Sequence, residues 1–276
     1  MRFEHLSYAN PAQPRLTQWV IRSIEGLSGR DHYADLYETW RREIAPTRDR
    51  IFGRMLDLIN VRFDLRGNWP AVDLPEGPLV IVANHPFGIG DGIAVLSLAE
   101  SLGRPFRVLM HNDLMRVPEM ADYALPVSFD ENRAAMEMNM RTRKEAMRLL
   151  AEGVTIVIFP AGGVATAPKG FGQAEDLPWK MFPARLVQAA RAHVLPVHFH
   201  GQNGRLFHLA SRVSMTLRTS LLIREFRRLS GTRIIADVGE VMRAEDLARI
   251  PDRKALLAEL QRAVFKQAMP EIRLAG

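Results

Sequence analysis

A histidine and an aspartate, His85 and Asp91, lie in the stretch NHPFGIGDG over residues 84–92, separated by five residues. A carboxylate bonded to one imidazole nitrogen fixes the tautomer of the ring, and the other nitrogen can then act as a base toward a hydroxyl group. Such a pair can deprotonate an alcohol directly or activate a serine, although the chain has no G-x-S-x-G nucleophile elbow. The stretch also fits a structural loop, in which His85 bonds to backbone and Asp91 caps a helix that begins near Gly92. Spacing alone favours neither interpretation.

The element that must position this pair is the apolar, β-branched run LVIVA over residues 79–83. A continuous run of this kind is typical of a strand covered on both faces, and ligands of open α/β sheets bind at the carboxyl ends of such strands. Pro86 holds the residue before it in an extended conformation. We expect Gly88, Gly90 and Gly92 to adopt the positive-φ turns that fold the aspartate back toward the histidine.

A second Gly-rich loop follows a second apolar strand in TIVIFPAGGVATAPKG, residues 155–170. This loop would bring backbone N–H groups to the same sheet edge, together with Thr166 and Lys169. Such a loop can hold an anion or an oxyanion. Two Gly-rich loops after two buried strands, one of them with a His/Asp pair, favour a catalytic site over a structural loop.

Strand-like and helix-like segments alternate after residue 60, which predicts an α/β fold with a mostly parallel central sheet flanked by helices. We expect one domain over residues 61–276 that ends in an amphipathic helix. The expected strands cover residues 61–67, 79–83, 106–110, 155–160, 193–199 and 233–240, and the expected helices cover residues 93–103, 132–153, 178–192, 219–231 and 252–269.

Residues 1–60 have the periodicity of amphipathic helices without a strand, and we expect an N-terminal helical extension that faces a membrane or serves as a scaffold. No signal peptide and no apolar run near 18 residues is visible, so we expect contact with a membrane surface rather than a span. The candidate contact segments are residues 16–27 with Trp19, residues 49–59 and the basic residues 221–233. The alternative for each is packing against the sheet.

The composition narrows the chemistry. The 276 residues include no cysteine, which excludes disulfides, thiolate zinc sites and a cysteine nucleophile. A net charge of +6 favours an anionic partner such as a membrane surface, a nucleic acid or a phosphate-bearing ligand. A nucleic acid is disfavoured because the chain has no helix-turn-helix cue, no RNP-type aromatic pattern and no zinc spacing.

Four blocks within residues 61–240 resemble the glycerolipid acyltransferase family of the 1-acylglycerol-3-phosphate acyltransferase type, and more narrowly its bacterial hemolysin-like, lyso-ornithine-lipid branch. NHPFGIGDG is similar to the family's His/Asp box, in the branch's form His-Pro-x-Gly-x-x-Asp-Gly. Residues 124–141, ALPVSFDENRAAMEMNMR, stand in the position of the acceptor-binding block. IFPAGGVAT is similar to the Phe-Pro-Glu-Gly block, called the third block below, and HVLPVHFHG is similar to the Pro-containing strand block.

The third block departs from the family pattern. Ala161 replaces the glutamate, and Gly163 and Val164 stand where threonine and arginine would follow. Because that block helps to bind the acceptor's phosphate in the family, the departure favours a lyso-aminolipid acceptor such as lyso-ornithine lipid, with lysophosphatidic acid as the alternative. Arg133 or Arg141 takes the place of the arginine of the acceptor-binding block, in a loose alignment.

The resemblance implies a mechanism without a cofactor or a metal. His85 would act as general base on the acceptor hydroxyl, Asp91 would orient it, and backbone N–H groups of Ala161–Gly163 would stabilise the oxyanion. The implied partners are an acyl carrier protein or CoA thioester, a lyso-lipid and an anionic membrane surface, with the protein cytoplasmic and peripheral on the inner face of a bacterial cell membrane. The alternative of another class is a non-catalytic lipid- or nucleic-acid-binding protein. The expected substrate-binding residues are Asn84, Phe87, Gly88, Arg133, Phe159, Pro160, Ala161, Gly162, Gly163, Thr166 and Lys169.

Other chemistry-bearing residues support weaker hypotheses. His198 and His200 share one face of a strand, with His193 and His208 nearby in the sequence, but no carboxylate cluster accompanies them and packed histidines are favoured over a metal site. The run His111-Asn112-Asp113 favours a helix start capped by Asn or Asp over a pocket wall. The run RTRKEAMR favours a solvated helix face over docking of an acidic carrier protein.

Overall fold

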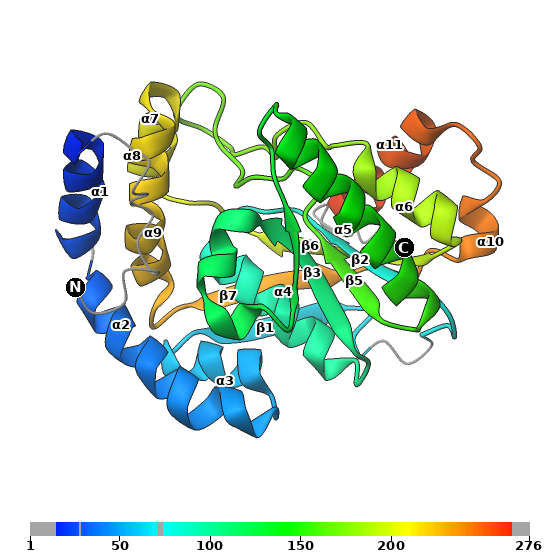
Figure 1. The fold of residues 1–276 in the computed structure, drawn as a ribbon, viewed down its shortest axis with the longest axis horizontal. Helices are drawn as coiled ribbons and strands as arrows, with labels where there is room; N and C mark the ends of the chain where they lie inside the picture. The colour runs from blue at the N-terminus through cyan, green and yellow to red at the C-terminus, as the bar shows by residue number, and fades with distance from the viewer. Residues whose placement is uncertain (1–14, 28, 71–73, 267–276) are drawn as a thin grey trace, which may run out of the picture.

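The computed structural model describes residues 15–27, 29–70 and 74–266, and these form a seven-stranded sheet with helices on both faces (Figure 1). The order of the strands is β1-β7-β6-β2-β5-β3-β4. The expected α/β class is therefore confirmed. The strands are β1 (Arg62–Gly67), β2 (Leu79–Ala83), β3 (Phe106–His111), β4 (Ala124–Val127), β5 (Thr155–Ile158), β6 (His193–His200) and β7 (Arg233–Val238).

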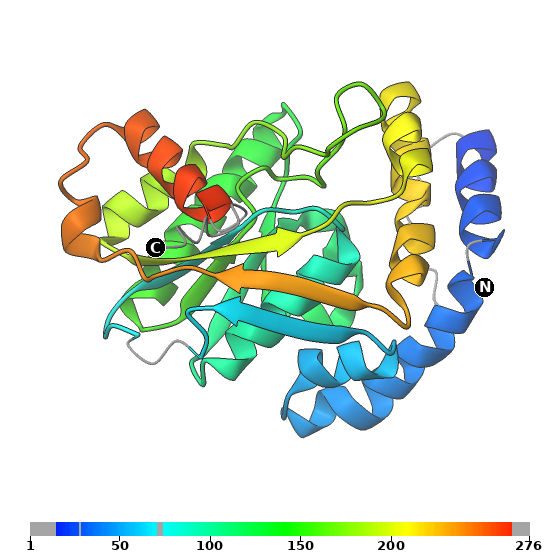
Figure 2. The ribbon, with the colours of Figure 1, turned by 180° about the vertical axis from the view of Figure 1, so that it is seen from behind.

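The sheet is mostly parallel, as predicted. β6, β2, β5, β3 and β4 run in one direction, whereas β7 is antiparallel to β6 and carries β1 parallel to itself. Figure 2 shows the arrow of β6 opposed to those of β7 and β1. Val82 of β2 pairs with Ile158 of β5, so the two Gly-rich loops leave the same edge of the sheet from adjacent strands.

Helices complete three layers. One face of the sheet is covered by α3 and α4, whose buried side chains share a core with Leu79, Ile81 and Ala83. The other face is covered by α5, α6 and α11, which pack with Val80 and Val82. The α-helices are α1 (Arg15–Leu27), α2 (Arg30–Thr39), α3 (Ile51–Leu58), α4 (Ile89–Ser101), α5 (Arg133–Ala151), α6 (Phe182–Ala190), α7 (Arg205–Val213), α8 (Met215–Ser220), α9 (Leu222–Leu229), α10 (Ala244–Leu247) and α11 (Arg253–Lys266).

A smaller group of helices stands at one end of the sheet. α7, α8 and α9 pack around Val164, which lies in the loop after β5, and α1 packs against α8 (Figure 1). Figure 2 shows β6 pointing toward this group. The carboxyl edge of the parallel strands therefore faces a group of helices formed by α1, α7, α8 and α9.

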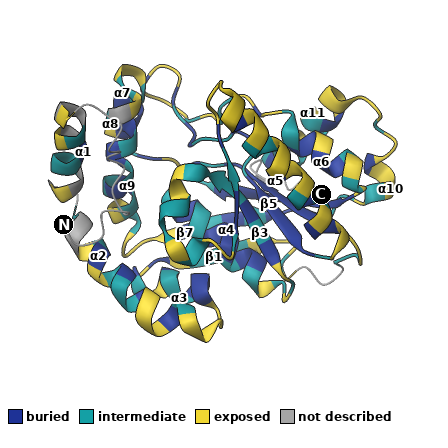
Figure 3. Cartoon of the chain, viewed as in Figure 1, coloured by how far each residue is buried: buried dark blue, intermediate teal, exposed yellow. Residues whose placement is uncertain are grey.

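The N-terminal segment shares the main core. Trp40, Phe52 and Leu56 belong to the same hydrophobic cluster as the sheet, and the Trp40 indole donates to the Ile51 carbonyl at 3.0 Å. The Glu100 carboxylate of α4 accepts the Ile51 and Phe52 backbone N–H groups at 2.6 and 3.2 Å, which satisfies the free amides at the start of α3. The apolar stripe of residues 49–59 was a candidate for membrane contact. Its buried residues pack against the sheet instead (Figure 3).

Several short elements differ from the prediction. α4 begins at Ile89 rather than residue 93, and the predicted helix over 219–231 is split into α8 and α9. β4 and α7 were not predicted, because a four-residue strand and a nine-residue helix offer few periods of hydrophobic repeat. Of the part that the structure describes, no helix has both the length and the hydropathy that crossing a bilayer requires.

Candidate active site

His85 and Asp91 lie in contact at the carboxyl end of β2. The His85 Nδ1 and Asp91 Oδ1 atoms are 3.0 Å apart, with the aspartate side chain fully buried and the histidine side chain 16% exposed. Neither of these two atoms has another hydrogen-bond partner among the described residues. The ring is thus held through Nδ1, and its Nε2 atom remains available to a molecule that enters from solvent.

The backbone around His85 is anchored on three sides. The side-chain amide of Asn84 forms two hydrogen bonds with β6. It donates to the Phe199 carbonyl at 2.9 Å and accepts the Phe199 N–H at 2.6 Å. The His85 N–H donates to Asp176 Oδ1 at 3.1 Å, and the His85 carbonyl accepts the Ala165 N–H at 2.7 Å. Asn84, expected among substrate-binding residues, is therefore a brace between two strands.

Asp91 also holds the loop that precedes the helix in which it lies. It is in the first turn of α4, and its Oδ2 atom accepts the Phe87 N–H at 2.7 Å while Oδ1 faces His85. The aspartate thus braces the loop and faces the histidine at once, although it is not the side-chain cap of α4 that the structural interpretation expected. Phe87 itself is buried in the main core, where its ring fills the space beside Gly201.

The glycines act differently from the prediction. Gly88 alone of the three has a positive φ, 88°, whereas Gly90 and Gly92 lie inside α4. The expectation that all three make turns is wrong, because the helix itself turns Asp91 back. A Cβ at Gly88 would also stand 3.1 Å from side-chain atoms of Val164 and Leu222, so this position needs glycine for its conformation and for its neighbours.

The third block lies directly beside His85. The ring of Phe159 stacks on the imidazole with centroids 4.1 Å apart, and Pro160 and Ala161 are buried behind it. Gly162 has φ 68° and donates its N–H to the Phe159 carbonyl at 3.0 Å. Because the Gly162 N–H is already hydrogen-bonded within the turn, it is not free to bind an oxyanion. This corrects the expectation that the whole Ala161–Gly163 segment offers donors.

Three expected binding residues have no described contact with the His85–Asp91 pair. The Arg133 side chain is 94% exposed and forms an ion pair with Glu137. The backbone of Thr166 exchanges both of its hydrogen bonds with Glu175, at 3.0 and 3.1 Å. Lys169 is exposed, and its carbonyl accepts a hydrogen bond from Arg212 Nη1 at 3.0 Å.

Three residues near the site were missed by the sequence analysis. Phe129 reaches the third block, because a Cβ on Gly162 would lie 2.8 Å from its ring. Asp176 bonds the His85 backbone and the Trp179 indole, and burial raises the pKa of its carboxyl group. Arg218 of α8 donates from Nη2 to the Val164 carbonyl at 2.5 Å. Asp176 and Arg218 lie in segments without a motif, and Phe129 lies in the acceptor-binding block over residues 124–141 but was not singled out there, so only the folded chain brings the three together.

The histidines of β6 and His111 have structural partners. His198 and His200 share a face of β6 as expected, and His200 Nε2 lies 2.6 Å from Asp237 Oδ2. Within the described ranges no group of three or more potential ligands could hold a metal ion. His111 accepts the Asp113 N–H and caps the short 3₁₀ helix η4 (Asn112–Arg116), so the helix start is confirmed with the histidine, not Asn or Asp, as its cap.

His198 should make the stability of the fold depend on pH. Burial, with a smaller contribution from His200, lowers the pKa of His198 from 6.5 to about 4. The unfolded chain then binds a proton more readily, so the free energy of unfolding should fall as the pH drops from about 6.5 to about 4, by on the order of 2–3 kcal/mol. The free energy of unfolding, measured with denaturant at several pH values, should show a shallower slope against pH in His198→Gln than in the wild type. Equal slopes would contradict the assignment, since His193 and His208 titrate in both proteins.

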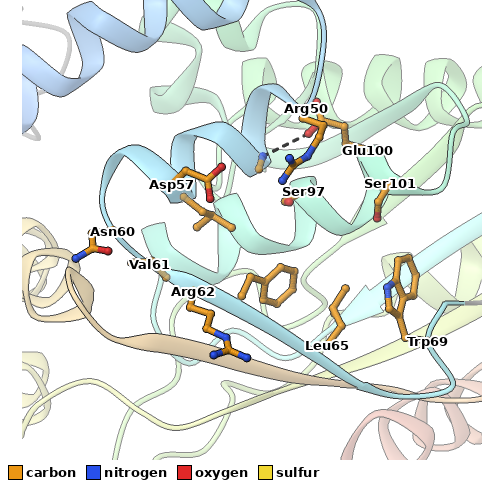
Figure 4. A pocket seen from close by; sticks show the side chains of 13 residues that line it. Arg50, Asp57, Asn60, Val61, Arg62, Leu65, Trp69, Ser97, Glu100 and Ser101 are labelled. Carbon is orange, nitrogen blue, oxygen red and sulfur yellow. Dashed lines mark hydrogen bonds between the residues drawn. The ribbon is translucent and has the colours of Figure 1, made fainter.

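A cavity of ≈ 690 Å³ lies away from the His/Asp pair, between α3, β1 and α4 (Figure 4). Its lining includes Arg50, Arg62 and Trp69. The Glu100 carboxylate at its wall is occupied by the α3 amides. None of its lining residues belongs to the stretch 84–92 or to the third block, so the cavity adds no group to the site.

A family model described as "Acyltransferase" matches residues 61–232, which are more than half of the chain. The chain belongs to this acyltransferase family. The matched segment of this family member contains both Gly-rich loops and the His85–Asp91 pair. The family resemblance expected from the sequence is thus confirmed.

Two curated relatives of this acyltransferase-family chain are lyso-glycine lipid O-acyltransferases. The one from Phocaeicola vulgatus is 27% identical over 168 residues, covering 59% of this chain and 55% of the relative. The one from Bacteroides thetaiotaomicron is 28% identical over 172 residues, covering 59% and 57%. The chain thus matches little more than half the length of these relatives. The crystal structure of the 1-acyl-sn-glycerophosphate (LPA) acyltransferase PlsC from Thermotoga maritima aligns over 92% of this chain and 90% of that one, with a TM-score of 0.49 and 16% identity.

Proposed function

We propose that this protein is an O-acyltransferase that moves a fatty acyl group from a thioester to a hydroxyl group of a lyso-lipid. The observation that carries the proposal is the 3.0 Å contact between the His85 and Asp91 side chains inside the segment that matches the family. A buried carboxylate on Nδ1 selects the tautomer in which Nε2 carries a lone pair, as a general base requires.

The proposed reaction needs no covalent enzyme intermediate. His85 Nε2 takes the proton of the acceptor hydroxyl as its oxygen attacks the thioester carbonyl, and a C–O bond forms. The tetrahedral intermediate collapses with cleavage of the C–S bond, and the leaving thiolate takes the proton back from the imidazolium. Asp91 stabilises the imidazolium, and the stacked Phe159 restricts the orientation of the ring.

Donors for the oxyanion are available beside His85. In the third block, the N–H groups of Ala161 and Gly163 have no backbone acceptor among the described residues, unlike that of Gly162. The first N–H groups of α4, at Ile89 and Gly90, also lack partners within their own helix. We assign the oxyanion to these donors because fixed backbone dipoles need no reorganisation during the reaction.

The acceptor we propose is a lyso-aminolipid with a glycine or ornithine head group. The relatives named as lyso-glycine lipid O-acyltransferases favour this class. The third block carries Ala161, Gly163 and Val164 in place of the side chains that would hold a phosphate, which points in the same direction. The acyl donor is an acyl carrier protein or a CoA thioester, and either is an anionic partner for a chain with net charge +6.

The lipid acceptor requires contact with a bilayer, and we place the protein on the inner face of the cell membrane. Trp19 of α1 is 66% exposed, and α7 exposes Leu206, Leu209 and Val213 on its outer side. Arg205 and Arg212 are exposed on the same helix, a combination that suits an anionic lipid surface. Residues 1–60 would thus contribute to the membrane contact through α1, with α2 and α3 as scaffold.

Purified protein should transfer an acyl group from acyl carrier protein or CoA thioester to a lyso-aminolipid in vesicles, with the diacyl product identified by mass spectrometry. Anionic lipid in the vesicles should raise the rate. Lysophosphatidic acid in a parallel reaction identifies the competing acceptor. Formation of phosphatidic acid alone would contradict the aminolipid proposal, and equal rates on neutral and anionic vesicles would contradict the electrostatic contact.

A further inference from the structure

Arg218 is a buried cation at the edge of the candidate site. It lies on α8, is 9% exposed, and is the one arginine or lysine that is buried among the described residues. Its Nη2 atom donates to the Val164 carbonyl at 2.5 Å, and its guanidinium group lies 5.7 Å from the centroid of the Phe207 ring. The remaining guanidinium nitrogens are neither hydrogen-bonded to the described residues nor sealed from solvent.

This cation has no counter-ion in the part of the chain that the structure describes. The buried carboxylate of Glu225 is shared by Arg224 at 3.3 Å, Arg228 at 3.0 Å and the Gly204 N–H at 2.7 Å. Burial lowers the pKa of Arg218, and no neighbouring acid raises it. An unpaired buried charge is expensive, so a position that retains one is suited to an anion supplied from outside.

One peptide group connects this cation to the proposed base. The carbonyl of the Val164–Ala165 peptide accepts from Arg218, and the N–H of the same peptide donates to the His85 carbonyl at 2.7 Å. A Cβ on Gly163 would lie 3.8 Å from Arg218 Nη2. Residue 163 of the third block therefore lies beside the guanidinium, and Leu177 Cδ1, 3.1 Å from the same Cβ position, packs next to it.

We propose that Arg218 binds the carboxylate of the acceptor's head group and thereby selects amino-acid lyso-lipids; this inference rests on the proposed function. The planar guanidinium matches a carboxylate in shape and carries one positive charge, which balances one negative charge. A phosphate monoester carries about −1.5 to −2 charges and would need a second cation. The candidates for that second cation are Lys169, in the loop after β5, and Arg212, on α7. Both are exposed to solvent, so neither is a buried partner for a phosphate.

The test compares two acceptors that differ in this charge, with a phosphate-bearing acceptor beside them. A hydroxyacyl-glycine, its carboxamide and lysophosphatidic acid are given to the wild type, Arg218→Gln, Arg218→Lys and Arg104→Gln. The wild type should prefer the carboxylate over the carboxamide by about 10–100-fold in kcat/KM, the range of a charged hydrogen bond.

Arg218→Gln should lose this preference for the carboxylate, mainly through KM, while keeping its carboxamide rate within a few-fold. Arg218→Lys should keep part of it. Arg104→Gln, at an arginine before β3 that also bonds loop carbonyls, should keep all of it.

Each other outcome overturns the inference. A wild type that uses carboxylate and carboxamide equally contradicts it without reference to any variant, so a failure of Arg218→Gln to fold does not rescue it. Equal losses on both acceptors in Arg218→Gln would make Arg218 a brace for Val164. A dependence on Arg218 for lysophosphatidic acid alone would transfer the role to phosphate. Absence of transfer to every lyso-lipid would instead refute the proposed function.

Discussion

Replacement of His85 by alanine should lower kcat for acyl transfer by at least about 10²–10⁴-fold, the usual contribution of general-base catalysis. The imidazole is the proposed acceptor of the hydroxyl proton, and its Nδ1 atom lies 3.0 Å from a buried carboxylate, which leaves Nε2 for the acceptor. The measurement is kcat at saturating thioester and lyso-lipid. The backbone hydrogen bonds of residue 85 to Asp176 and Ala165 do not involve the side chain, so the loop should keep its conformation.

The chain provides a matched control in another of its His/Asp pairs. His200 Nε2 lies 2.6 Å from Asp237 Oδ2, with the His200 side chain 34% exposed. His200 lies on the face of β6 that carries His198, which packs against Phe265 of α11, opposite to the face on which α4 packs. His200→Ala should therefore retain the wild-type rate within a few-fold. Near-wild-type turnover by a folded His85→Ala protein, confirmed by thermal unfolding, would refute the assigned base.

Replacement of Asp91 by asparagine should lower kcat by on the order of 10³–10⁴-fold through the wrong tautomer of His85. Asp91 Oδ2 accepts the Phe87 N–H at 2.7 Å, and an asparagine keeps this bond only with its carbonyl oxygen on that side. Its NH₂ group then faces His85 Nδ1. The ring must accept there and carry its proton on Nε2, where a base needs a lone pair.

The double variant distinguishes this explanation from a loss of stability. If Asp91 acts only through His85, then Asp91→Asn should add little to the defect of His85→Ala, because residues that act as a unit are not additive. Asp237→Asn is the matched control and should leave transfer unchanged. A multiplicative double defect, or a rate for Asp91→Asn within a few-fold of the wild type, would contradict the orienting role.

The long elements and the His/Asp box were predictable from the sequence because their signals are local. The run LVIVA forms the fully buried β2, and the amphipathic repeat over residues 252–269 forms α11, whose described part ends at Lys266. The start of α4 was not predictable, since Gly90 and Gly92 disfavour a helix interior. Gly90 is tolerated there because Leu229 of α9 fills the space that a Cβ would take.

The contacts that complete the site depend on distant parts of the chain. Asp176 reaches the His85 backbone from a loop with no pattern, and Phe129 reaches Gly162 from the segment after β4. No sequence signal marked Arg218. The predicted helix began at residue 219, whereas α8 begins at Met215 and includes Arg218. Such residues are defined by tertiary packing, which hydrophobic periodicity does not encode.

The most direct test of the account is the release of free thiol from an acyl thioester, measured with and without a lyso-lipid acceptor in the wild type and in His85→Ala. We expect release by the wild type to require the acceptor, because no acyl-enzyme forms and the acceptor oxygen is the nucleophile. We expect His85→Ala to show no acceptor-dependent release above background. Acceptor-dependent release by His85→Ala at the wild-type rate would contradict the central claim that His85 activates the acceptor hydroxyl.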